Sequence, residues 1–163
     1  MFREAVARQP LIFYMKIEEE IKQSKFKNPF QKVAINLLYT AKWLEANNNI
    51  FFKEFGITGQ QFNILRILRG QHPASTSAAI IKERMLDRNS DVSRMLDRIL
   101  DKKLVVKSQC PSDKRAFDVK ITDAGLKLLA KIDLRLEEID SKFLNLTSKE
   151  ATQLSDLLDK CRG

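Results

Sequence analysis

The stretch that decides the fold is "NSDVSRMLDRILDKKLVV", residues 89–106. Its apolar side chains fall at intervals of three and four residues, which is the spacing of one buried face on an α-helix. They are Val92, Met95, Leu96, Ile99 and Leu100. Charged and polar side chains occupy the opposite face, and Asn89 is a candidate N-cap. The sequence therefore predicts an amphipathic helix that leads directly into a short β-prone segment, "LVVKS" (104–108).

A β-hairpin is predicted after this helix. "AFDVKI" (116–121) alternates apolar and polar residues, as a half-buried strand does. The intervening "QCPSDKR" (109–115) contains the Pro, Ser and Asp that are typical of turns. The hairpin is therefore expected to have a polar, basic tip.

Further helices are predicted on both sides, over about 28–56, 58–70, 75–87, 123–144 and 147–162. Side chains suited to capping a first turn precede four of them: Asn28, Thr58 with Gln61, Thr122, and Thr147 with Glu150. Gly70 is expected to end its helix in a left-handed conformation.

The predicted order is helix, helix, short helix, helix, hairpin, helix, helix. A short helix and a tight turn can hold the next helix so that it protrudes from the surface, where its first turn fits a DNA major groove. A hairpin directly afterwards places its tip beside the adjacent minor groove. The predicted fold class is therefore mainly α with a small β-hairpin wing, a winged helix-turn-helix over residues 58–122.

The charge distribution fits this arrangement. The 163-residue chain has a formal net charge of +8 and a pI near 9.6, which favours polyanionic partners. Residues 84–120 contain ten basic and six acidic side chains, so they supply half of the excess. Asp97 and Asp101 oppose phosphate binding, and we therefore expect only the first half of the helix to enter the groove, with Asp97 paired to a nearby arginine.

Several classes of function are disfavoured. Two cysteines and one histidine are too few for a disulfide framework or a Cys/His metal site, and no cofactor is expected. No apolar run approaches the length of a membrane span, which predicts a cytoplasmic protein without a membrane partner. The sequence also lacks a recognisable nucleophile–base pair and phosphate-binding loop, so an enzyme is not expected.

At these residues the sequence resembles the MarR family of bacterial transcription regulators. "GITGQQFNILRILRG" (56–70) is similar to the second helix of that family, and residues 87–129 are similar to its recognition helix, wing and following helix. The most specific part is "DKRAFDVKIT" (113–122), because the family carries an acidic residue two before an arginine in the wing. The resemblance covers about residues 30–160.

The resemblance implies an obligate homodimer that binds a near-palindromic operator in double-stranded DNA, most often as a repressor. Residues 28–57 and 123–163 would be the dimerisation helices, and residues 1–27 an N-terminal extension, either an extra helix or a segment upstream of the true start. The DNA-contacting residues it implies are Ser75, Thr76, Ser77, Asn89, Ser90, Ser93, Arg94, Arg98, Asp113, Lys114 and Arg115. Arg94 would approach base edges, Arg98 would hold phosphate, and Arg115 would enter the minor groove.

Two departures from the family pattern stand out. Lys103 occupies the position where the family usually has glycine between the recognition helix and the strand. A non-glycine residue in the left-handed conformation costs on the order of 1 kcal/mol, so a looser or differently shaped turn is expected. The N-terminal extension also exceeds the usual length, which predicts a dimer interface of different construction.

The sequence is compatible with more than one mode of regulation. Many relatives release DNA when a small aromatic or lipophilic ligand binds, and Tyr39, Trp43 and His72 are candidates to line such a site; the alternative is that they only pack or turn the chain. Cys110, beside the basic residues of the wing, is a candidate redox sensor, although no resolving cysteine is evident. A further alternative is a winged helix that binds another protein instead of DNA.

Overall fold

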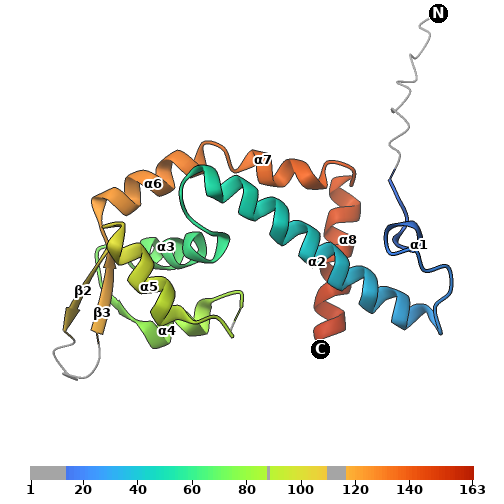
Figure 1. Ribbon diagram of the computed structural model, residues 1–163, viewed down its shortest axis with the longest axis horizontal. Helices are drawn as coiled ribbons and strands as arrows, with labels where there is room; N and C mark the ends of the chain where they lie inside the picture. Colours follow the sequence, from blue (N-terminus) through green and yellow to red (C-terminus); the bar gives the residue numbers. More distant parts are fainter. Residues whose placement is uncertain (1–13, 88, 110–116) are drawn as a thin grey trace, which may run out of the picture. The chain divides into compact units, whose positions relative to one another are not determined.

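The computed structural model describes residues 14–87, 89–109 and 117–163 (Figure 1). In chain order the elements are α1 (Ile17–Glu20), α2 (Pro29–Glu54), α3 (Gly59–Gln71), β1 (Thr76–Ser77), α4 (Ala78–Arg84), α5 (Val92–Asp101), β2 (Val105–Gln109), β3 (Phe117–Ile121), α6 (Asp123–Asp133), α7 (Glu137–Asp140), the 3₁₀ turn η1 (Ser141–Phe143) and α8 (Ser148–Arg162). The chain divides into two compact units. We call residues 43–141 the winged unit, and residues 1–42 with 142–163 the helical unit.

The predicted helix starts are confirmed by capping hydrogen bonds. The Asn28 Oδ1 atom accepts a hydrogen bond of 2.9 Å from the backbone N–H of Gln31 at the start of α2. The hydroxyl groups of Thr58, Thr122 and Thr147 accept equivalent bonds from the N–H groups of Gln61, Gly125 and Glu150. Each bond satisfies an N–H that has no partner within its helix, so these starts are encoded locally.

The predicted end of α3 at Gly70 is wrong. The helix continues to Gln71, and among the described residues the glycines with positive φ are Gly56 and Gly163. His72 follows with φ −59° and ψ 135°. A residue before proline avoids the helical region because the proline ring crowds its backbone, so Pro73 ends this helix without a left-handed glycine.

The sheet of the winged unit has three strands, in the order β1-β3-β2, all antiparallel. The predicted hairpin is confirmed in β2 and β3, which pair from Val105 opposite Ile121 to Gln109 opposite Phe117. The sequence did not predict β1, where Thr76 pairs with Val119. A strand of two residues is too short to show an alternation of apolar and polar side chains. The helix expected over 75–87 is correspondingly shorter, as α4.

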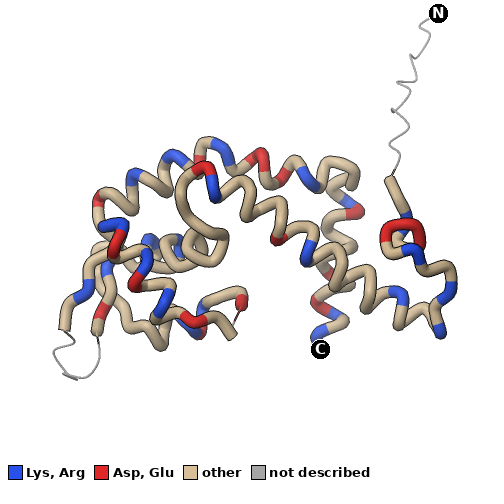
Figure 2. Tube along the Cα trace, viewed as in Figure 1, with Lys and Arg blue, Asp and Glu red and all other residues tan. Residues whose placement is uncertain are grey.

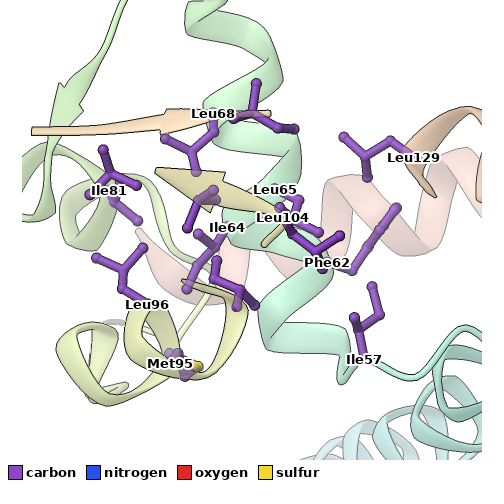
Figure 3. Close-up of a cluster of buried hydrophobic side chains, with 14 of the residues drawn as sticks. Ile57, Phe62, Ile64, Leu65, Leu68, Ile81, Met95, Leu96, Leu104 and Leu129 are labelled. Carbon is purple, nitrogen blue, oxygen red and sulfur yellow. The ribbon is translucent and has the colours of Figure 1, made fainter. Parts of the chain in front are cut away.

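The core of the winged unit lies between its helices and the inner face of the sheet (Figure 3). Its fully buried side chains come from α3, α4, α5, both long strands and α6. The largest are Ile64, Leu65, Leu68, Ile81, Leu96, Ile99, Val105, Val119, Leu129 and Ile132. Burial of this kind contributes roughly 1.5–3 kcal/mol for each large aliphatic side chain, so the core holds α5 in place against α3 and the sheet.

The turn from α5 into β2 is a Schellman motif with lysine at its left-handed position. Lys103 has φ +59°. The N–H of Lys103 donates to the carbonyl oxygen of Leu100 at 2.8 Å, and the N–H of Leu104 donates to the carbonyl oxygen of Ile99 at 3.0 Å. Leu104 and Ile99 are both buried, which supplies the apolar contact that accompanies this motif. The expectation of a looser turn is therefore wrong: packing imposes the glycine conformation on a lysine.

In the helical unit, the segment before α2 is tied to that helix by polar contacts. Lys32 Nζ lies 2.5 Å from Glu18 Oε1, and the Tyr39 hydroxyl donates a hydrogen bond of 2.6 Å to Glu20. Ile17 of α1 is buried. Part of the predicted N-terminal extension thus forms one helical turn, whereas residues 1–13 lie outside the described part of the chain.

Candidate nucleic-acid interface

The two faces of α5 are those that the sequence predicts. Its buried residues are Val92, Met95, Leu96 and Ile99. Its exposed polar residues include Ser93, Arg94, Asp97 and Arg98. Basic and acidic residues alternate along this helix in Figure 2. The helix therefore offers two arginines to a partner, while its apolar face holds it in the winged unit.

The start of α5 differs from the prediction by two residues. Asp91 is the N-cap, and its Oδ1 atom accepts a hydrogen bond of 3.0 Å from the N–H of Arg94. The capping role predicted for Asn89 is therefore wrong. Asn89 is exposed in the preceding loop, where its N–H donates to Asp87 Oδ1 at 3.0 Å.

Ser90, another predicted contact, is a buried residue with 7% of its surface exposed. Its hydroxyl donates to Asp87 Oδ2 at 3.0 Å and accepts from Gln60 Nε2 at 3.2 Å. Gln60 also donates to Asp87 Oδ2 at 3.3 Å. The sequence reading missed Gln60 and Asp87, because Gln60 lies 30 residues before Ser90 and no periodic pattern links the two.

The wing is joined to α5 by an ion pair between Lys107 of β2 and Asp97. The pairing partner predicted for Asp97 was an arginine, and the structure places this lysine there instead. Opposite Lys107 in the sheet lies the buried Val119, so the base of the lysine side chain is on the core side of the hairpin. The predicted tip residues Asp113, Lys114 and Arg115, and Cys110, lie outside the described residues.

The three predicted contacts before α4 have different environments. Ser75 is exposed, and its hydroxyl donates to Asp118 of β3 at 3.3 Å. Thr76 is buried in β1. Ser77 caps α4 by accepting from the N–H of Ile80 at 3.3 Å. Ser75 thus combines a structural bond with surface exposure, Ser77 is half-buried, and Thr76 is buried.

The residues considered for a ligand site are distributed over α2 and the end of α3. Trp43 of α2 is 41% exposed, and His72 is exposed at the C-cap of α3. Tyr39 is in the helical unit, and its hydrogen bond to Glu20 raises the pKa of its phenol above the ordinary value. The phenol therefore already has a partner within the chain.

Neither a metal-binding cluster nor a membrane-spanning helix is present in the part of the chain that the structure describes. Among the described residues, no group of three or more His, Cys, Asp or Glu side chains is placed to bind a metal ion. None of the helices in the described ranges has the length and apolarity needed to span a bilayer.

A mainly helical chain whose helix-turn-helix, α4 and α5, is followed by an antiparallel wing is a winged helix-turn-helix protein. A sequence profile of the MarR family matches residues 57–117, from two residues before α3 to the first residue of β3. A MarR transcription factor from Planctomyces limnophilus is 30% identical; the match covers 83% of this chain and 98% of that one, with a TM-score of 0.65. The protein belongs to the MarR family, whose members are DNA-binding transcription regulators, as the sequence resemblance predicted.

Other solved structures share the fold. A point variant of MarR from E. coli, solved in complex with operator DNA, is 25% identical, with coverage of 85% of this chain and 99% of that one and a TM-score of 0.73. BpsR from Bordetella bronchiseptica, whose DNA binding is regulated by 6-hydroxynicotinic acid, is 22% identical, with coverage of 78% and 99% and a TM-score of 0.65. No curated protein sequence matches the chain at a significant level.

Proposed function

We propose that this protein is a homodimeric, sequence-specific repressor that acts in the cytoplasm on a near-palindromic operator in double-stranded DNA. The observation that carries the proposal is the placement of Arg94 and Arg98 on the exposed face of α5, whose other face is locked into the core. A helix that is fixed by its buried face and has exposed arginines on the opposite face is suited to recognition in the major groove.

The proposed contacts divide into two kinds. Asn89, Ser93 and Arg94 would approach base edges, because they are exposed in the first turn of α5 or just before it. Arg98, Ser75 and Ser77 would position the protein on the phosphates. In the wing, Lys114 and Arg115 would reach the minor groove, and Asp113 would fix the wing. Ser90 and Thr76, which the resemblance also implies as contacts, are both buried.

The homodimer is supported by apolar side chains that the helical unit leaves exposed. On the first half of α2 they include Phe30 (82% exposed), Val33 (55%) and Leu37 (44%). On α8 they include Leu154 (43%) and Leu157 (52%). Exposed apolar patches on helices commonly mark an interface, and residues 28–57 and 123–163 are therefore proposed as dimerisation segments.

The experiment that tests DNA binding is a selection of duplexes from a random pool, followed by gel shifts over a series of salt concentrations. We expect two half-sites about one helical turn apart and affinity that falls steeply with salt. Arg94→Ala should reduce discrimination between the selected and a scrambled duplex, and Arg115→Ala should weaken binding to the selected duplex. Lys25→Ala removes the same charge at an exposed residue outside the winged unit and outside the proposed dimerisation segments, and should change neither.

The same experiment separates the rival functions. Failure to enrich any duplex would favour a winged helix that binds another protein. Retention of tight binding in Arg115→Ala would contradict the assignment of the wing. Loss of binding on mild oxidation, absent in Cys110→Ser, would favour a redox sensor, and Cys161, exposed on α8, is the control.

Release of DNA by a small aromatic ligand is a second proposal, supported by the ligand-regulated BpsR, which has the same fold. Trp43 is the sole tryptophan of the chain, so its fluorescence reports directly on binding near α2. We expect 6-hydroxynicotinic acid or a similar aromatic acid to change this fluorescence and to weaken the gel shift. An effect on the gel shift that is unchanged in Tyr39→Phe, Trp43→Phe and His72→Ala would place the ligand elsewhere.

A further inference from the structure

We infer that Gln60 and Asp87 are positioning residues for DNA recognition, and that Ser90 acts with them inside the protein, not at a base edge. Together they form what we call the α3–α5 clamp, defined by Gln60, Asp87 and Ser90. The inference rests on the proposed function, because it explains how the reading end of α5 is held. It assigns a role to two residues that the sequence pattern did not single out.

The Ser90 hydroxyl is already hydrogen-bonded within the chain. A serine hydroxyl has a single proton to donate, and that of Ser90 is donated to Asp87 Oδ2 at 3.0 Å. The oxygen also accepts from Gln60 Nε2 at 3.2 Å, and the residue is only 7% exposed. To donate to a base, this buried hydroxyl would have to give up its bond to Asp87, so the bond within the protein is its more stable use.

Asp87 holds the two residues that lead into α5, Asn89 and Ser90. Its Oδ2 atom accepts from Ser90 and Gln60, while its Oδ1 atom accepts from the N–H of Asn89 at 3.0 Å. Its own carbonyl accepts from the N–H of Ser90 at 3.2 Å. One residue therefore fixes the two that precede the N-cap, Asp91, and Asp91 in turn bonds to the N–H of Arg94.

Gln60 ties the loop before α5 to α3. The other bonds described for Asp87 and residues 89–91 stay within the loop or the first turn of α5, whereas the bonds from Gln60 reach α3. α3 is rigidly placed, because Leu65 and Leu68 in it are fully buried. Through Gln60, the positions of Asn89, Ser93 and Arg94 are fixed relative to the core of the winged unit. Base recognition needs side chains that are placed with this precision.

These contacts predict a specific change in DNA binding. Gln60 and Ser90 are uncharged, so their loss leaves the number of phosphate contacts, and hence the salt dependence, unchanged. Loss of the clamp instead lets the base-reading side chains move, which lowers affinity for the preferred duplex alone. We expect the ratio of affinities for the selected and a scrambled duplex to fall about three- to tenfold, the size of one net hydrogen bond.

The test is a double-mutant cycle on the full-length protein, with Gln60→Ala, Ser90→Ala and the double variant. The probes are the duplex that wild-type protein enriches from a random pool and a scrambled duplex of equal length. Each single variant should lower the affinity ratio, and the double variant should lower it no further than the larger single effect, since all three break one clamp. Binding to the scrambled duplex and the salt slope should match those of the wild type.

Thr58→Ala is the matched control. It removes the cap of α3, where the Thr58 hydroxyl accepts from the N–H of Gln61 at 3.2 Å, without touching Asp87 or Ser90. It should lower the thermal midpoint while keeping the wild-type affinity ratio. An equal loss of ratio in Thr58→Ala and Gln60→Ala would overturn the inference, because the effect would then be one of general stability.

Two further results would contradict the inference while leaving the proposed function intact. If Ser90→Ala lowers the ratio and Gln60→Ala does not, Ser90 contacts DNA directly. If the two effects add fully, Gln60 and Ser90 act separately. If the wild type enriches no duplex at all, the proposed function itself fails, and the positioning role fails with it.

Discussion

The winged unit and the helical unit use similar amphipathic helices with opposite results. In the winged unit, α3 buries Gln61, Phe62, Ile64, Leu65 and Leu68. In the helical unit, α8, every residue of which is described, buries none, although its leucines also recur at helical spacing. Phe30 and Leu38, on the first half of α2, are 82% and 68% exposed.

The difference lies in whether the chain itself supplies a covering surface. Strand β3, the helices α4, α5 and α6, and the end of α2 pack on α3, so the winged unit completes its own core. The apolar faces of α8 and of the first half of α2 are left for a surface of another molecule, which the proposed homodimer would provide. An amphipathic pattern therefore predicts that a face will be covered, but does not tell by which chain.

The strongest test of this comparison sets one leucine of each unit against the other. Leu65→Ala removes a side chain that is 0% exposed, and we expect a loss of about 2–5 kcal/mol in the free energy of unfolding. Leu157→Ala removes one that is 52% exposed, and we expect a much smaller loss in urea titrations at low protein concentration. Equal losses would show that α8 is already buried within the monomer.

A glycine substitution tests how tightly the winged unit is closed. A Cβ atom on Gly125 would lie 2.4 Å from the carbonyl oxygen of Leu104 and 2.7 Å from Ile121 Cγ1, so Gly125→Ala should cost about 1–3 kcal/mol in thermal unfolding. Gly70→Ala is the control, since its Cβ, in the last turn of α3, would meet nothing within 4 Å. That variant should gain about 0.5–1 kcal/mol. A harmless Gly125→Ala would mean that α6 is not seated as described.

Assembly should depend on the helical unit. Leu37→Glu places a charge on the exposed apolar face of α2, and we expect the dimer dissociation constant to rise by about tenfold or more, which corresponds to about 1.4 kcal/mol. Leu86→Glu makes the same change at a residue of the winged unit that is 93% exposed, and should leave assembly unchanged. Sedimentation equilibrium measures both. A protein that is monomeric before any substitution would refute the assignment of this face to dimerisation.

The smallest expected effect concerns strain within the winged unit. Lys103→Gly should stabilise the protein by up to about 1 kcal/mol, because glycine has no Cβ and adopts φ +59° without the steric crowding that the lysine Cβ causes. Lys102→Gly removes the same charge at a residue with φ −80°, and should destabilise. Hydrogen exchange should show the gain in β2 and β3 and not in α8. A loss of stability in Lys103→Gly would mean that the lysine side chain contributes more than its backbone strain costs.

Much of the fold was predictable because its signals are local. The caps at Thr58, Thr122 and Thr147 and the apolar stripe of α5 each depend on residues within one or two turns of the chain, and all are confirmed. The predicted exposure of Arg94 and Arg98 followed from the same stripe. Two errors occurred where the outcome depends on another element: β1 forms against β3, and Asp97 pairs with Lys107. Two others, at Gly70 and Asn89, misplaced a helix boundary by one or two residues.

The sequence by itself determined the helices, the hairpin and the family of this protein, because capping, helical periodicity and strand alternation act between residues that are near each other in the chain. Only the tertiary structure decided that Ser90 turns inward to Gln60 and Asp87, and that Lys103 takes a glycine conformation. The physical reason is that hydrogen bonds and packing between distant segments outweigh the preference of a single residue. That preference is on the order of 1 kcal/mol, whereas each buried apolar side chain around it contributes more.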